Sequence, residues 1–568
     1  MKMGLGGTVG RRVRAVGWAW VLVLAAGLAG GCLTPRQYAE QADDEAYGII
    51  ADKWDAGLGE RPDYNIDANA TDANSRAVSG QISLARAVAV ATNRNRNYQR
   101  QKDLLYTKAL NLTLERHRFA RQWLASLGGG YDKDAGGEAV RADGVVGVNQ
   151  ALADGAQVGL AVAMNWLEYL AGDSRGSLAT VISASFTQPL LRRFGRKVAQ
   201  EDLTQAERDT LYQIRSFNRY RKTFVVSIIT DYFGVLRAMD RVENDRLNYK
   251  NLLANQRRVE MMANTGRVPQ FQAGEVRQSA LQALDRYNRS SEAYKTELEQ
   301  FRVRLAMPAD ADVTLDANEL TALAAKGISD PNVALDVAVA AGLNLRLDLA
   351  NTRDAVDDAD RKVAVAADAL RAELNLTARA DVSSSGAKDI DRFRLSDGTY
   401  GVGLELDLPL DRKLERNLYR QAQIARAESK RTYDEQVDGV RLEIRQAHRD
   451  LLEAHTSYKI QQTSLKLAAK RVDMQLILLQ EGRATTRNYL DAQEDLLEAQ
   501  NDKTAALVDF TLASLRFYRD IGLLRVRPDD TWETPDPKDL RRGAGPDYSP
   551  GPTTAATTRP TKIKTRRD

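Results

Sequence analysis

Residues Ser183–Leu191, with the sequence SASFTQPLL, join a strand-like segment to a very long helical pattern that ends near Gly266. A second version of this arrangement begins at Gly403–Leu410, with the sequence GLELDLPL, and ends near Gly482. The proline and the glycine are 77 residues apart in the first copy and 73 residues apart in the second. A repeat of this size indicates two copies of one structural unit, each joining strands to an exceptionally long helix.

The long segments carry a heptad-like apolar pattern. In the second copy one register holds Val437, Val440, Ile444, Ala447, Leu451, Ala454, Tyr458, Leu465, Ala468, Val472 and Leu479. A sustained 3.5-residue repeat is typical of supercoiled helices, and a helix of about 73 residues is about 110 Å long. A helical pattern resumes directly after Gly266-Arg267 and after Gly482-Arg483. Each copy is therefore expected to be a helical hairpin that turns at a Gly-Arg pair.

The strands are expected to precede these helices, with Pro189 and Pro409 at the strand-to-helix corners. Strand character begins at Trp123–Tyr131, whereas Asp132–Gly155, rich in Gly and Asp, is expected to be a loop. Two strands per copy are expected, over Val158–Leu170, Leu178–Phe186, Leu374–Val382 and Tyr400–Leu408. The aromatic residues Trp123, Trp166, Tyr169 and Phe186 either form a belt at a membrane interface or pack as ordinary strand residues.

The N-terminus has the pattern of a secretion signal. Arg11, Arg12 and Arg14 precede the apolar run Ala15–Leu28, and small residues lead to Cys32. This pattern resembles a lipoprotein processing site, in which Cys32 becomes the first residue and carries lipid. An ordinary signal peptide and a twin-arginine signal are the alternatives.

The predicted organisation has six parts. They are a signal peptide (1–31), a linker after the lipidated cysteine (32–81), a first repeat (82–306, strands about 120–188, tip near 266), a connector (307–334), a second repeat (335–523, strands about 374–408, tip near 482) and a disordered periplasmic tail (524–568). The expected fold class is mostly α with a small β part. It is a two-fold internal repeat of strands and very long coiled-coil helices.

Composition argues against catalysis and nucleic-acid binding. The net charge is +4, from 81 basic and 77 acidic residues that are interspersed rather than clustered. No nucleophile arrangement, phosphate loop or metal-ligand cluster stands out, and His448 and His455 are seven residues apart, which is not metal-ligand spacing. We therefore expect no enzyme activity, no cofactor, no metal and no nucleic-acid partner.

The ordered set of motifs resembles the TolC family of outer-membrane efflux proteins over Ile82–Leu523. The resemblance rests on the helix start Leu84–Asn93, the corner Thr187–Leu191 and the two bending glycines. The second corner, Asp407–Leu410, departs from the family pattern. The resemblance implies a homotrimer in which each chain gives four strands to a twelve-stranded barrel and four helical columns to a periplasmic tube. It also implies an adaptor protein docked at the tips, an inner-membrane pump, and a passive role in efflux or type I secretion.

The resemblance also points to residues at the tips. Asp491 and Glu275 stand nine positions after the two glycines, and Asn488 and Gln272 stand six positions after them. The resemblance implies that these positions line a pore constriction. The alternative is a solvated carboxylate favoured by the helix dipole. Arg267 and Arg483 either hold the closed tip, contact the adaptor or are ordinary surface residues.

A different function also fits part of the sequence. A lipid-anchored periplasmic coiled-coil tether without a pore would explain the heptads and the signal, but not the strands with their proline corners. The exported cargo stays open between drugs, metals, polysaccharides and proteins.

Overall fold

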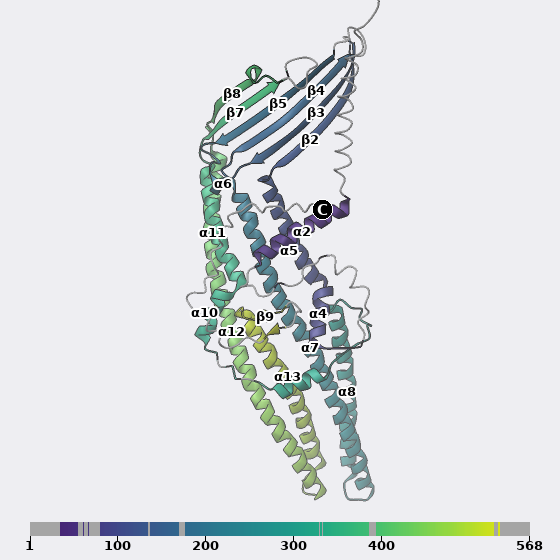
Figure 1. Cartoon of the computed structure of the whole chain (residues 1–568). Coiled ribbons are helices and arrows are strands. Elements are labelled where there is room, and N and C mark those ends of the chain that lie inside the picture. Colours follow the sequence, from purple (N-terminus) through teal and green to yellow (C-terminus); the bar gives the residue numbers. More distant parts are fainter. Residues whose placement is uncertain are drawn as a thin grey trace, which may run out of the picture.

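The computed structural model describes residues 34–54, 61, 66, 80–134, 137–169, 176–328, 330–331, 333–384, 393–527 and 532–533. The chain forms an elongated molecule in which one antiparallel sheet stands at the end of a bundle of long helices (Figure 1). The predicted signal peptide and Cys32 lie outside the described residues.

The sheet has six strands in the order β2-β3-β4-β5-β7-β8, and each neighbouring pair is antiparallel. The strands are β2 (Gln122–Asp134), β3 (Gly137–Ala151), β4 (Gln157–Tyr169), β5 (Gly176–Pro189), β7 (Glu373–Ser383) and β8 (Thr399–Asp407). The two copies of the repeat meet where β5 pairs with β7, and Pro189 lies opposite Asn375 there. The first copy thus supplies four strands and the second copy two.

The prediction of two strands per copy was wrong for the first copy. The segment Asp132–Gly155, expected to be a loop, contains β3, which pairs with β2 on one side and β4 on the other. The segment alternates as a strand does: Val140, Val146 and Val148 share one face of β3, while Arg141 and Asp143 share the other. The many glycines and aspartates, which are typical of loops, made this alternation hard to recognise in the sequence.

The helices repeat in the same order in both copies, which confirms the internal repeat. The first copy has α4 (Leu84–Arg94), α5 (Arg96–Arg118), α7 (Glu201–Asn264) and α8 (Gln270–Arg304), and the second has α10 (Leu335–Leu345), α11 (Leu347–Asp368), α12 (Lys413–Gln480) and α13 (Thr486–Asp520). The helix α7 has 64 residues and α12 has 68, which corresponds to about 96 and 102 Å. Both are shorter than expected because a corner segment, including the short helix α6 (Arg196–Ala199) in the first copy, precedes each of them.

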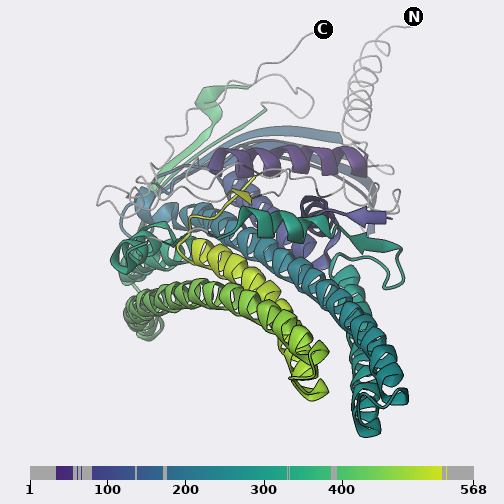
Figure 2. The same cartoon turned by 90° about the horizontal axis from the view of Figure 1, so that it is seen from below.

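Contacts between the helices define a lateral order. Near the tips the order is α12-α13-α7-α8, and near the sheet it is α12-α11-α7-α5. Figures 1 and 2 show the α12–α13 hairpin beside the α7–α8 hairpin, both of them curved. One lateral edge of the molecule is therefore formed by β8 and α12, and the other by β2, α5 and α8.

Small elements surround the middle of the helices. The strand β1 (Gly80–Ile82) pairs in parallel with β6 (Val313–Leu315), and α9 (Asn318–Lys326) follows. The predicted linker 32–81 contains the helix α2 (Pro35–Lys53), which packs on α5 and buries Ile49 and Ile50. The predicted tail 524–568 begins with β9 (Arg525–Val526), which pairs with β10 (Trp532–Glu533). For these stretches both predictions were wrong, since α2 packs on α5 and β9 contacts α7.

Ion pairs join the two copies between α7 and α11. Arg208 lies 2.8 Å from Asp358, Arg215 lies 2.6 Å from Asp354, and Arg219 lies 3.3 Å from Asp348. Asp354 and Asp358 are buried, so each carboxylate needs its arginine partner to offset the loss of water around it. The row of pairs fixes the register of α7 against α11 and, through it, the position of the corners below the sheet.

Candidate functional site: sheet faces and helical tips

One face of the sheet is apolar across all six strands. A row of cross-strand partners runs from Trp123 through Val148, Leu160, Ala184 and Ala380 to Tyr400. Further members of this face are Leu127, Val146, Val162, Ile182, Val402, Leu404 and Leu406. Many of these side chains are exposed, and the exposed fraction reaches 75% for Trp123 and 81% for Val402. An apolar exposed surface of this extent marks contact with lipid or with another protein.

The opposite face is mostly polar or small along the same strands, with Leu124, Val145, Leu167 and Val181 as its large apolar members. It carries Ser126, Asp132, Arg141, Asp143, Asn149, Asn165, Ser183, Ser185, Asn375, Thr377, Arg379, Asp381 and Glu405. Arg141 and Asp132 form an ion pair at 2.9 Å on this face. An alternation of mostly apolar and mostly polar residues along each strand is typical of strands that separate a bilayer from an aqueous interior.

Within the described part of the chain, no helix combines the length and the apolar character that a membrane crossing needs.

Of the aromatic residues singled out in the sequence, three lie on the apolar face. Trp123 and Phe186 are near the helical end of the sheet and Trp166 is near the far end. The side chain of Tyr169 lies outside the described residues. A belt at a membrane interface stays a prediction.

The predicted corners hold the sheet on the helices. Pro189 is the last residue of β5, and the next residue, Leu190, donates its N–H to the carbonyl of Leu374 at 2.7 Å. Pro409 follows β8, and its carbonyl accepts a hydrogen bond from Arg412 at 3.1 Å. Arg412 also donates to the carbonyl of Leu370 at 2.7 Å, which ties the start of α12 to the end of α11.

Gly266 and Gly482 end their helices in the same way, as the sequence predicted. Their φ angles are +75° and +72°, values that glycine adopts without steric cost. The next residues, Arg267 and Arg483, donate backbone N–H groups to carbonyls five positions earlier, at 2.9 and 2.8 Å. This is the Schellman arrangement of a helix C-terminus. The turn uses only the backbone of these two arginines; the side chain of Arg267 is exposed, and that of Arg483 pairs with Glu481.

The predicted tip residues occupy different environments. Arg267, Asn488 and Asp491 are exposed, Gln272 and Glu275 are partly buried, and Arg483 forms an ion pair with Glu481 at 3.5 Å. The structure brings only Gln272 into a contact between the two hairpins, and its partner is a residue that the sequence did not single out. The hydroxyl of Thr486 donates to Oε1 of Gln272 at 2.9 Å. Thr485 caps α13, and this capping pattern could have pointed to the first residues of the helix.

Side chains of α13 also link the hairpins behind the tips. Leu490 packs against the apolar residues of α7 and α8, including Val259 and Val276. Arg286 of α8 and Glu494 of α13 lie 2.5 Å apart, and Asn244 of α7 donates to Asn501 at 3.0 Å. Near the tips, the α7–α8 hairpin is therefore held against α13 by both apolar packing and polar contacts.

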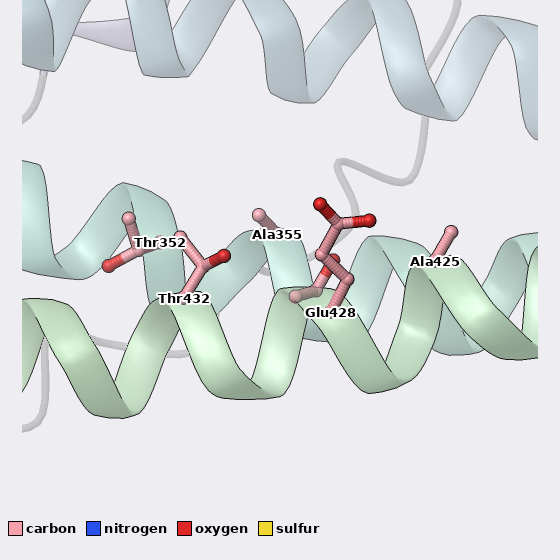
Figure 3. A pocket seen from close by; sticks show the side chains of 6 residues that line it. Thr352, Ala355, Ala425, Glu428 and Thr432 are labelled. Atoms are coloured by element: carbon pink, nitrogen blue, oxygen red, sulfur yellow. The ribbon is translucent and has the colours of Figure 1, made fainter.

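A pocket between α11 and α12 offers little for ligand chemistry (Figure 3). It is lined by Thr352, Ala355, Ala425, Glu428, Ser429 and Thr432. Ala425, Glu428 and Thr432 are exposed to solvent, so the site neither excludes water nor gathers several charges. In the described residues, no group of His, Cys, Asp or Glu is arranged to hold a metal ion.

A two-faced sheet standing on two long helical hairpins is the architecture of solved outer-membrane efflux channels. Residues 340–523, within the second copy, match the sequence model of the family Outer membrane efflux protein. The resemblance to TolC-family efflux proteins noted from the sequence is confirmed by this match and by the fold. No curated protein sequence is matched.

Solved structures share the architecture at low sequence identity. The Campylobacter jejuni outer membrane channel CmeC superposes with a TM-score of 0.55 and 14% identity, covering 81% of this chain and 89% of CmeC. VceC, an outer membrane protein of Vibrio cholerae, gives a TM-score of 0.53 and 12% identity, with coverage of 77% and 96%. The open state of the Neisseria gonorrhoeae outer membrane channel MtrE gives 0.53 and 12%, with coverage of 78% and 89%. At these identities the matches establish the fold.

Proposed function

We propose that this protein is a passive exit duct of the outer membrane in a tripartite efflux or type I secretion system. The observation that carries the proposal is the sheet, apolar on one face and polar on the other, joined through its corners to helical hairpins about 100 Å in length. The sheet would cross the outer membrane, and the helices would extend into the periplasm. The chain would supply a water-filled route and no catalytic step.

A homotrimer would complete the duct. The edge helix α12 carries a stripe of exposed apolar residues at seven-residue spacing, formed by Ile460, Leu467 and Met474. The opposite edge helix α8 exposes Phe271, Leu281 and Val303. Because the two edges differ, contact between them is head-to-tail, and such contacts close into a ring when the rotation fits. A ring of three copies is the assembly that agrees with the fold of the efflux channels.

The tips would form the gate. We propose that opening separates the α7–α8 turn from the α12–α13 turn and breaks the Thr486–Gln272 hydrogen bond. Asp491, Glu275, Asn488 and Gln272 would line the constriction in the assembled ring. Acidic side chains from three copies would then give a ring of like charges, which favours cations.

The remaining partners belong to the same proposal. A periplasmic adaptor would dock at the exposed tips around Arg267 and Arg483, and an inner-membrane pump would drive transport. Lipid on Cys32 would add an anchor to the outer membrane next to α2. Leu33, rather than an acidic residue, follows this cysteine, as suits lipoproteins sorted to the outer membrane.

The mass and secondary structure of the purified protein test this proposal against the tether without a pore. Mature protein extracted from outer membranes in mild detergent should have the native mass of three chains and a β-signal in circular dichroism that persists on heating. A monomer with a purely helical spectrum would refute the duct and favour the tether.

A further inference from the structure

We propose that the β2–β3 hairpin forms part of the membrane-spanning wall of the duct. Each copy contributes six strands, β2 of one copy pairs with β8 of the next, and three copies close an eighteen-stranded barrel. This inference rests on the proposed function and goes beyond it, because it names the pairing surface and the bore of the channel. The family resemblance noted from the sequence implies twelve strands.

The two edge strands of the sheet each need a further strand to pair with. Among the described strands, β2 pairs only with β3 and β8 pairs only with β7, so each leaves one row of backbone N–H and C=O groups unpaired. Unpaired strand edges cannot face lipid. With an even number of antiparallel strands, β2 and β8 run in opposite directions. A second copy, rotated about the barrel axis, would therefore offer its β8 in the antiparallel orientation that β2 needs.

The hairpin continues the membrane pattern of the other strands. Leu127 of β2 and Val146 of β3 are about half exposed on the apolar face, while Asp143 and Arg141 lie on the polar face. A hairpin standing outside the bilayer would have no reason to keep this alternation in register with β4. The pattern thus assigns β2 and β3 to the wall.

The sheet already has the stagger of a closed barrel. The row of partners that starts at Trp123, one residue from the helical end of β2, ends at Tyr400, seven residues from the helical end of β8. The strand ends therefore shift by about six residues, or about 20 Å, across about 24 Å of sheet. This corresponds to a strand tilt of about 40°, within the range of closed barrels.

The width of the sheet agrees with the width of the helical part. Six strands spaced by about 4.8 Å and tilted by about 40° occupy about 37 Å of circumference, whereas four would occupy about 25 Å. The four helical columns below, at 8–10 Å per helix, occupy about 32–40 Å. Six strands therefore continue the helical wall without narrowing it.

The test compares pore widths at the outer mouth. Two variants are made: one lacks residues 122–156 and joins α5 to β4 through a short Gly-Ser bridge, and the other lacks only 131–140. The second keeps all six strands and shortens the hairpin. The unmodified protein and the two variants, otherwise complete, are reconstituted in planar bilayers, and neutral polymers of graded size are added from the extracellular side.

Barrel diameter grows roughly linearly with strand number. We expect the largest polymer that enters to shrink in diameter by about a third for the variant lacking 122–156, and to stay unchanged for the variant lacking 131–140. Equal cut-offs for the unmodified protein and the variant lacking 122–156 would overturn the inference. Absence of any ion conduction by the unmodified protein would instead refute the proposed function.

A second measurement decides the matter if the variant lacking 122–156 does not assemble. Electron cryo-microscopy of the unmodified protein in detergent should resolve eighteen strands, with β2 and β8 adjacent between copies. Any other strand count, or a β2–β3 hairpin folded away from the wall, would overturn the inference.

Discussion

Asp358 of α11 joins the two copies of the repeat through Arg208 and Tyr212 of α7, and it also pairs with Arg361 of its own helix. Its carboxylate is 4% exposed and lies 2.8 Å from Arg208, 2.9 Å from Arg361 and 2.7 Å from the hydroxyl of Tyr212, which donates to it. Removing one partner from a buried charged network leaves the others unpaired. We expect Asp358→Asn to lower the free energy of unfolding by about 3 kcal/mol, measured by denaturant titration in detergent.

The neighbouring residue supplies the control. The side chain of Asp357 is 66% exposed, and its carboxylate is 3.9 Å from Arg208, which is long for an ion pair. Asp357→Asn should change stability by less than about 0.5 kcal/mol. Equal effects of the two substitutions would show that the ion pairs between α7 and α11 contribute nothing specific.

Lys222 of α7 makes stability depend on pH. Burial, reinforced by the positive charges of Arg219, Arg525 and Arg221, lowers the pKa of Lys222 from 10.5 to about 8, while its ammonium donates to the carbonyl of Gly522 at 3.2 Å. Between these two pKa values the unfolded chain binds the proton more readily than the folded chain, so this group adds stability as pH rises from about 8 to 10.5.

Comparison with Lys222→Met isolates this effect from other titrating groups. We expect the melting temperature of the unmodified protein, relative to that of Lys222→Met, to increase between pH 7 and pH 10. A difference that stays constant over this range would contradict the lowered pKa.

The helical turns show how an element depends on one backbone conformation. A methyl group added at Gly482 or at Gly234, in the middle of α7, meets no atom within 4 Å, but only Gly482 has a positive φ, of +72°. Gly482→Ala should therefore destabilise the turn by about 1–2 kcal/mol, whereas Gly234→Ala should stabilise α7 by about 0.5–1 kcal/mol. Hydrogen exchange at residues 478–490 measures the effect of Gly482→Ala, and it should become faster. Exchange around position 234 should become slower in Gly234→Ala, and faster exchange there would contradict the account.

The elements that sequence predicts well are those whose signal is local. The heptads around Val440 and Ile444 and the glycines at the two turns identified the long helices and their ends. The strand β3 was missed because Gly144, Gly147 and Asp143 resemble loop residues in a protein surrounded by water. In a wall with an aqueous face, such residues are compatible with a strand, and the alternation with Val146 and Val148 is the remaining signal.

Contacts between elements that are far apart in the chain could not be predicted from the sequence. The helix α2 lies in a polar stretch, and its burial depends on α5, which is more than forty residues away. The hydrogen bond between Thr486 and Gln272 joins residues 214 positions apart. The candidate tip residues were therefore found from the repeat, but their partners could not be found.

At the scale of the whole molecule, the edge helix α12 should control assembly. Leu467 is 62% exposed and contributes to the stripe with Ile460 and Met474, so a charge there would be buried at a contact between copies. If the proposed trimer forms through this surface, Leu467→Glu should yield monomers of unchanged helical content, measured by native mass spectrometry and circular dichroism. Gln462→Glu, an exposed position outside the stripe, should leave the trimer intact. A trimeric Leu467→Glu protein would mean that α12 is not a contact surface.

The most direct test of the central claim is the current through single assemblies in planar bilayers, compared between the unmodified protein and Thr486→Val. This substitution removes the hydroxyl that bonds Gln272 at the tip, whereas Thr511→Val, which removes only a bond within α13, serves as the control. The account predicts discrete ion-conducting channels whose conductance or open time increases in Thr486→Val and is unchanged in Thr511→Val. Absence of channels in all three proteins, despite insertion of the assembled protein, would contradict the claim that this chain forms a duct.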